Sequence, residues 1–253
     1  YKKWRFVAHL INNQAGSATF RTFNFMVSGS YDIMNDPSGE HMLTTGLQLG
    51  LLNKSFRTNS LTFDSQYSSE TGEFDTSIGS GENLASTNEY RFDAGLGLYY
   101  RYQPQGQNYS PYLGFSMAHI TLPNQSFSDD NEPLPILWKI NAGTDIEINK
   151  NVYIRSTFLM MHQKKAREYY LNINGMYQFN NKDYDMRLLM GYRIKDAFIF
   201  GMGMRFRELI FTMSYDINTS YLSSYSHGRG GFELGLSYQG LIRTEKIRMF
   251  MGL

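Results

Sequence analysis

The side chains of this sequence that could do chemistry are five scattered histidines and many charged residues at alternate positions. The histidines are His9, His41, His119, His162 and His227. None of them belongs to a pair with helical metal-binding spacing or to an HExxH motif. Cysteine is absent, which excludes thiolate metal sites, thiol nucleophiles and disulfides. The sequence therefore predicts no metal site and no cofactor.

Two histidines lie close in sequence to a serine, the minimal pairing of a hydrolase nucleophile with its base. His119 follows Ser116, and His162 follows Ser156. A hydrolase also needs a third group that orients the base, and proximity along one strand does not supply it. We expect a protein without catalytic residues, and a hydrolase is the less favoured alternative.

Charged and apolar residues alternate, and this alternation predicts the elements that hold them. From 136 to 148 the even positions are Ile, Trp, Ala or Thr, whereas the odd ones include Lys139, Asp145 and Glu147. A period of two is typical of a β-strand with one apolar and one polar face. The same period recurs at 42–53, 91–103, 168–179, 184–194, 198–207 and 232–239, and less regular strands are predicted at 4–12, 20–32, 111–120, 151–162 and 209–217.

The length of these strands indicates a membrane protein. Most have about 9 to 13 residues, enough for a tilted strand to cross a bilayer, whereas strands of soluble proteins centre on about 5 or 6. The mean hydropathy of −0.42 fits a barrel in which only alternate residues face lipid. We predict an all-β fold, an antiparallel up-and-down transmembrane β-barrel of the bacterial outer membrane, with residues 1–253 as its single domain.

The predicted connections alternate in length. Those at 54–90, 121–135 and 218–229 are long and polar, whereas 104–110, 149–150, 180–183 and the turn near 208 are short. Outer-membrane barrels have long extracellular loops and short periplasmic turns, which places both termini in the periplasm. The first connection is long for a structureless loop, so a hairpin from 55–66 and 71–82 raises the expected count from twelve strands to fourteen. The chain opens at Tyr1 with no export signal in view, and we expect it to be a mature or trimmed sequence.

The two faces of the predicted strands have different expected surroundings. Apolar positions such as Ile146, Leu188, Phe200 and Leu234 should face lipid. The charged positions expected to face the lumen are Arg91, Asp93, Arg101, Lys139, Asp145, Glu147, Asp185, Arg187, Arg205 and Glu233. Because both signs are present, ion pairs could close the lumen, and a porin-like solute channel is the alternative. The net charge of +1 gives no reason to expect nucleic acid as a partner.

Several short sequence motifs occur along the chain in a characteristic order. They are GLQLGL at 46–51, LTFDSQY at 61–67, RFDAGLG at 91–97, SPYLGFSMAH at 110–119, LPNQSF at 122–127, SYDINTS at 214–220 and GRGGFEL at 228–234. In this order they resemble the PorP/SprF family of the Bacteroidetes, which is associated with type IX secretion and gliding motility.

The resemblance implies a non-enzymatic outer-membrane component of type IX secretion that acts as an adaptor or anchor. The implied partners are periplasmic lipoproteins and the translocon of the secretion machinery, or a secreted adhesin at the cell surface. Candidate contacts, or the scaffold that shapes them, are Asp64, Gln66, Tyr67, Asn124, Asn218, Arg229 and Phe232. The alternative for Asn218 is a purely turn-forming role, since Asn is a turn former.

Overall fold

The computed structural model describes residues 4–16, 20–35, 38–57, 62–75, 77–79, 81, 88–127, 130–180, 183–221, 223–226 and 228–238. His227 and parts of the predicted hairpin arms 55–66 and 71–82 lie outside these ranges. Among the described residues, no helix is long and apolar enough to cross a membrane. The single described α-helix, α1, is the short segment Ser223–Ser226.

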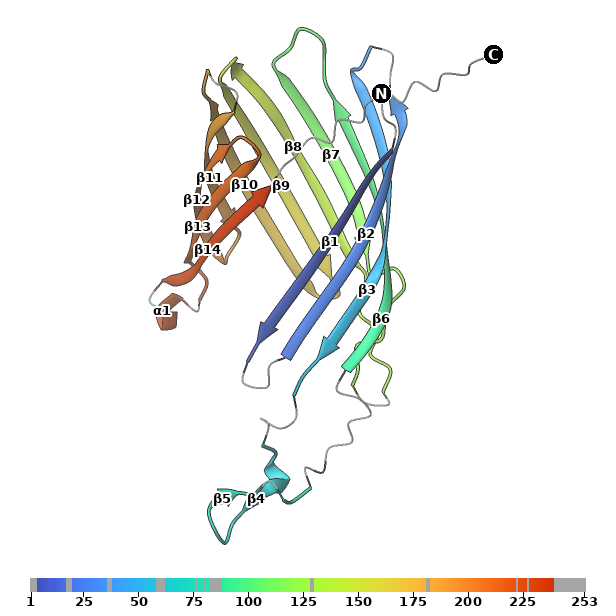
Figure 1. Ribbon diagram of the computed structural model, residues 1–253, viewed down its shortest axis with the longest axis vertical. Coiled ribbons are helices and arrows are strands. Elements are labelled where there is room, and N and C mark those ends of the chain that lie inside the picture. Colours follow the sequence, from blue (N-terminus) through green and yellow to red (C-terminus); the bar gives the residue numbers. More distant parts are fainter. Residues whose placement is uncertain are drawn as a thin grey trace, which may run out of the picture. The chain divides into compact units, whose positions relative to one another are not determined.

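Twelve strands form one sheet, in the order β1-β2-β3-β6-β7-β8-β9-β10-β11-β12-β13-β14 (Figure 1). Their bounds are β1 Trp4–Ala15, β2 Phe20–Asn35, β3 His41–Ser55, β6 Asn88–Tyr102, β7 Tyr109–Ala118, β8 Leu137–Asn149, β9 Val152–Gln163, β10 Ala166–Gln178, β11 Tyr184–Arg193, β12 Ala197–Phe206, β13 Leu209–Asn218 and β14 Arg229–Tyr238. The pairs from β1 to β7 and from β10 to β14 are antiparallel. This up-and-down topology of an antiparallel barrel confirms the predicted fold class.

The connection between β3 and β6 contains the two remaining described strands. They are β4 (Tyr67–Ser68) and β5 (Glu73–Phe74), which pair only with each other. The structure thus describes fourteen strands, of which twelve belong to the main sheet. A hairpin is present in this connection, but it differs from the predicted arms 55–66 and 71–82: the 3-10 helix η2 (Asp64–Gln66) occupies the end of the first arm, β4 begins after it, and the pair does not join the main sheet.

The strands expose their apolar side chains and bury their carboxylates. Along β11, Leu188 is 60% exposed, whereas Asp185 is only 1% exposed. The largest fully buried side chains among the described residues are Asp93 and Asp185. This is the reverse of a soluble fold, and it is typical of strands whose outer face meets lipid.

The connections between strands reproduce the predicted asymmetry of length. Alternate connections include 56–87, 119–136 and 219–228, and these are the long ones. The connections between them include 103–108, 150–151, 179–183 and 207–208, and all of these are short. Within a unit, alternate connections of antiparallel strands lie at the same end, and an alternation of long and short connections is typical of outer-membrane barrels.

Two compact units make up the chain. Unit 1 consists of Tyr1–Gln107, Pro111–Ala142 and Leu159–Glu168. Unit 2 consists of Asn108–Ser110, Gly143–Phe158 and Tyr169–Leu253. Both units contain buried carboxylates: Asp32 and Asp93 lie in unit 1, and Asp185 lies in unit 2.

Candidate functional site

The β3–β6 connection of unit 1 carries a small folded element, residues 62–75 and 77–79, which we call the docking hairpin. Its centre is Gln66, which is only 8% exposed. The Gln66 Oε1 accepts from the Phe63 N–H at 3.1 Å, and its Nε2 donates to the Ile78 carbonyl at 2.9 Å. The Asp75 N–H donates to the Gln66 carbonyl at 2.8 Å. One buried side chain and its backbone thus hold both arms of the docking hairpin together.

The docking hairpin exposes a pair of aromatic rings. Tyr67 and Phe74 are opposite each other in the β4–β5 register, with ring centroids 5.4 Å apart in an edge-on arrangement. Tyr67 is 51% exposed and Phe74 is 48% exposed. Exposed aromatic side chains on a fixed backbone are the usual anchors of protein–protein contacts.

The sequence of the docking hairpin is acidic. Between 62 and 79 the sequence has the carboxylates Asp64, Glu70, Glu73 and Asp75, and it has no lysine or arginine. Ser77 donates to the Asp75 carboxylate from its N–H at 2.8 Å and from its hydroxyl at 2.6 Å. These bonds lower the pKa of Asp75 from its ordinary value. The docking hairpin is therefore an anionic surface with an aromatic centre.

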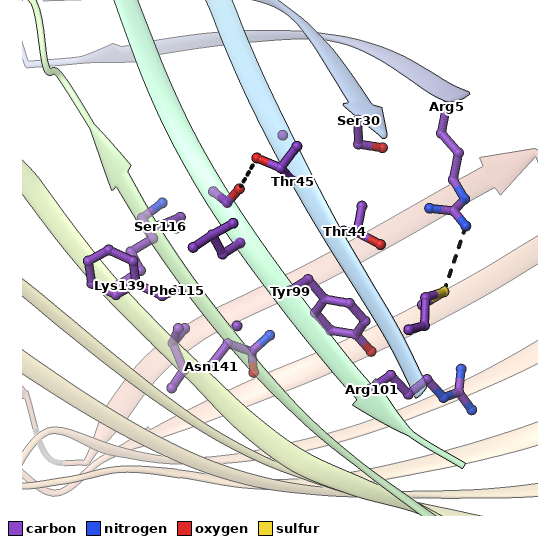
Figure 2. Close-up of a pocket in the computed structure, with 16 residues that line it drawn as sticks. Arg5, Ser30, Thr44, Thr45, Tyr99, Arg101, Phe115, Ser116, Lys139 and Asn141 are labelled. Carbon is purple, nitrogen blue, oxygen red and sulfur yellow. Dashed lines mark hydrogen bonds between the residues drawn. The ribbon is translucent and has the colours of Figure 1, made fainter. Parts of the chain in front are cut away.

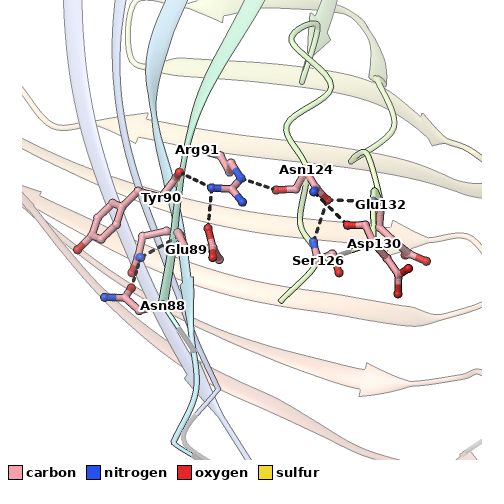
Figure 3. A network of polar contacts seen from close by, with 9 residues as sticks. Asn88, Glu89, Tyr90, Arg91, Asn124, Ser126, Asp130 and Glu132 are labelled. Atoms are coloured by element: carbon pink, nitrogen blue, oxygen red, sulfur yellow. Dashed lines mark hydrogen bonds and ion pairs between the residues drawn. The ribbon is translucent and has the colours of Figure 1, made fainter. Parts of the chain in front are cut away.

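Asn124 organises the next long connection, 119–136, also in unit 1. Its Oδ1 accepts from the N–H groups of Ser126 at 3.0 Å and Glu132 at 2.9 Å (Figure 3). Its Nδ2 donates to the Asp130 carbonyl at 3.2 Å, and its own carbonyl accepts from Arg91 Nε at 3.2 Å. Asn124 therefore shapes this loop and ties it to β6, so the structure places it in the scaffold.

The three remaining candidate contacts lie where β13 and β14 join in unit 2. The Asn218 Oδ1 accepts from the N–H of Ser220 at 2.9 Å and from its hydroxyl at 2.8 Å, and the Asn218 N–H donates to Gly228 at 3.2 Å. These bonds favour the turn-forming role for Asn218. Arg229 and Phe232 are exposed on β14.

Two of the charged residues predicted for the lumen are buried carboxylates. Asp93 accepts from the Ala94 N–H at 2.8 Å, and its other oxygen lies 2.7 Å from His119 Nδ1. Asp185 bonds the guanidinium groups of both Arg187 and Arg205. Each carboxylate thus has polar partners within its own unit.

The other predicted lumen charges have varied surroundings. Asp145 pairs with Arg155, and Arg91 pairs with Glu89 at 2.6 Å. Arg101 and Lys139 line a cavity of unit 1. Glu147 and Glu233 are exposed.

The sequence did not reveal a further charged cluster at the start of the sheet. Arg5 of β1 donates two hydrogen bonds of 2.8 Å to Asp32 of β2, and Thr44 of β3 donates a third at 2.7 Å. The sequence could have indicated Arg5, because it lies between Trp4 and Phe6 and alternation places it on the polar face of β1. The bulge between Asp32 and Met34 shifts the alternation and obscures the role of Asp32.

The hydrogen bonds described for the two histidines join neither His119 to Ser116 nor His162 to Ser156. The His119 ring bonds Asp93, and His162 Nε2 lies 2.9 Å from the Lys164 carbonyl. Within the described ranges, no group of three or more histidines or carboxylates is arranged to hold a metal ion.

Comparison with known proteins gives a family and similarity to solved structures. The family described as type IX secretion system membrane protein PorP/SprF matches residues 7–238. A search of individually curated proteins gave no match. One similar solved structure is that of the CymD monoaromatic hydrocarbon channel, with a TM-score of 0.47 and 11% identity, covering 86% of this chain and 75% of that chain.

The matched residues extend from within β1 to the last residue of β14 and include every sequence motif on which the resemblance was based. The resemblance is thus confirmed over nearly the whole described sheet. This chain belongs to the PorP/SprF family of type IX secretion system membrane proteins.

Proposed function

We propose that this protein is a non-enzymatic adaptor of type IX secretion in the outer membrane, and that its docking hairpin binds a partner at the cell surface. The observation that carries the proposal is the exposed Tyr67–Phe74 pair, held in place by the buried Gln66. A surface fixed before binding loses less conformational entropy when a partner arrives. Family membership supplies the secretion context.

The proposal includes an orientation in the membrane. The long connections 56–87, 119–136 and 219–228 would be extracellular, and both termini would be periplasmic. The docking hairpin, as part of the first of these, would then meet a secreted adhesin. The short turns would face the periplasmic lipoproteins and the translocon of the secretion machinery.

The chemistry of the docking hairpin describes the partner surface it fits. Tyr67 and Phe74 would insert into an apolar patch, and the four carboxylates of the docking hairpin would meet lysine or arginine side chains. Charges at the rim of an interface act mainly on association rate and weaken with salt. The partner should therefore carry a basic rim around an apolar centre.

Affinity purification of the tagged full chain from its native envelope tests the proposal. The double variant Tyr67→Ala/Phe74→Ala should lose the surface partner while the barrel still migrates as a heat-modifiable folded species. Tyr109→Ala, at a tyrosine that is also exposed but lies outside the docking hairpin, should retain the partner. Raising the salt from about 0.05 M to about 0.5 M should weaken capture by the wild type.

A second variant tests the wider set of candidate contacts. Alanine at Asp64, Tyr67 and Arg229 together should abolish co-purification of the partner and leave the folded barrel intact. If the double variant and the triple variant both captured the partner as well as the wild type does, the adaptor proposal would be overturned. A large ohmic conductance of the wild type in a planar bilayer would instead favour the solute channel.

A further inference from the structure

Unit 1 contains a cavity of about 770 Å³ on the polar face of its strands (Figure 2). Residues from β1, β2, β3, β6, β7, β8 and β9 line it. Glycines and serines, among them Gly46, Gly97, Gly114, Ser30 and Ser116, leave room where larger side chains would fill the space. The volume is in the range of small-molecule sites.

The charged residues that line this cavity are all cations. The lining includes Arg5, Arg101 and Lys139, and it includes no aspartate or glutamate. The carboxylate of Asp32 is bound twice by Arg5 and once by Thr44, so it neutralises Arg5. Lys139, for which the described part of the chain offers no acidic partner, therefore gives the cavity wall a positive charge.

Two polar side chains of β8 in the cavity wall lack partners within the part of the chain that the structure describes. Lys139 makes neither an ion pair nor a side-chain hydrogen bond there. The Oδ1 of Asn141 is buried and has no hydrogen-bond partner. Because an amide can exchange its oxygen and nitrogen by rotation, Asn141 can present an N–H donor at the same position.

We propose that this cavity binds a small organic carboxylate. Lys139 would pair with the carboxylate, Asn141 and Ser116 would donate hydrogen bonds to it, and Leu159 and Tyr99 would contact its apolar part. Lys139 is half-buried in the cavity wall, and an anionic ligand would give it the charged partner that the described part of the chain does not provide. The site shares no residue with the docking hairpin, so it stands independently of the adaptor function.

Equilibrium dialysis of the purified full chain in nonionic detergent, with radiolabelled benzoate as the probe, tests the site. Binding should be saturable. The uncharged analogue benzamide and the cation benzylamine should bind at least about tenfold more weakly, since a charge-assisted hydrogen bond is lost. Lys139→Gln should weaken benzoate binding by a similar factor, and Lys139→Arg should largely preserve it.

Lys150→Gln is the matched control, because Lys150 is exposed in the turn that follows β8 and does not line the cavity. The affinity of the Lys150→Gln variant for benzoate should equal that of the wild type. Equal affinities of the wild type for benzoate and benzamide would show only apolar uptake and would overturn the proposal. Full benzoate binding by folded Lys139→Gln, or no saturable binding by the wild type, would overturn it as well.

Discussion

Asp185 and Arg205 are register partners on β11 and β12, and their side chains are hydrogen-bonded. Arg187, on the same face of β11, donates to the other Asp185 oxygen at 2.8 Å. The carboxylate is 1% exposed, whereas both guanidinium groups reach solvent in part. One buried anion therefore stabilises two neighbouring cations in unit 2.

Replacing this anion should be costly. Asp185→Asn leaves Arg187 and Arg205 facing each other without a carboxylate, and we expect a loss of about 3–5 kcal/mol in the free energy of unfolding. Urea titration of the protein in lipid vesicles measures it. The control is Asp196→Asn, at a half-exposed carboxylate whose partner Arg193 keeps Asp216. It should cost under about 1 kcal/mol, and equal losses would contradict the role of Asp185.

Neighbouring leucines of β11 should differ in their tolerance of charge. Leu188 belongs to the exposed apolar face, whereas Leu189 is opposite Gly201 and Asn174 on the polar face. Leu188→Arg should lower stability in lipid by about 2–4 kcal/mol if it lies near the midplane. Leu189→Arg should cost less, because its side chain can extend into water. If quenchers in the lipid phase reached labels at both positions equally, the assignment of faces would be wrong.

Consecutive glycines at the start of β14 should respond differently to a methyl group. A Cβ at Gly230 would lie 1.9 Å from the Asp216 carbonyl oxygen, beside the bulge of the β13–β14 pair, whereas one at Gly231 would have no heavy atom within 4 Å. Gly230→Ala should force the strands apart, at a cost of about 1–3 kcal/mol. Gly231→Ala should fold like the wild type. The folded fraction on a heat-modifiability gel compares them, and similar yields would argue against this close packing.

Acid should loosen the docking hairpin. The pKa of Asp75 is lowered by hydrogen bonds from Ser77, so its charged form stabilises the folded hairpin above the ordinary value of 3.8. That contribution disappears as the pH falls through the lowered pKa. Pepsin cleavage within 62–79 should therefore rise steeply below about pH 4. Asp75→Asn should remove this step, and a step that persists in the variant would assign it to another group.

The regular alternation made most of the main sheet predictable. The predicted strands 184–194 and 198–207 agree closely with Tyr184–Arg193 and Ala197–Phe206. β1 was less regular because Val7 and Ile11 are exposed apolar residues whose register partners are Ser28 and Asn24. An apolar residue on both faces weakens a period-two signal.

The partners of each charge could not be predicted, because they depend on register between strands. The sequence showed charges of both signs on one face, which favoured a closed lumen. In the observed register Asp185 and Asp32 pair with nearby arginines, and Lys139 lines a cavity that has no acidic lining residue. Gln66 was predicted as a contact residue or as part of the scaffold that shapes the contacts, and its bond to the Ile78 carbonyl favours the scaffold role. That hydrogen bond depends on the fold of a loop whose sequence has no regular alternation, so the sequence could not predict it.

The docking hairpin also affects how the chain folds. β3 and β6 pair along their whole lengths across the 56–87 connection, the longest between neighbours of the main sheet. A chain segment of this length must close before the two strands meet, and each doubling of a loop adds about 0.6 kcal/mol to the entropy cost. By joining Phe63 to Gln66 and Gln66 to Ile78, the docking hairpin shortens the segment that remains free. Forming it early should therefore speed the pairing of β3 with β6 more than it raises the final stability.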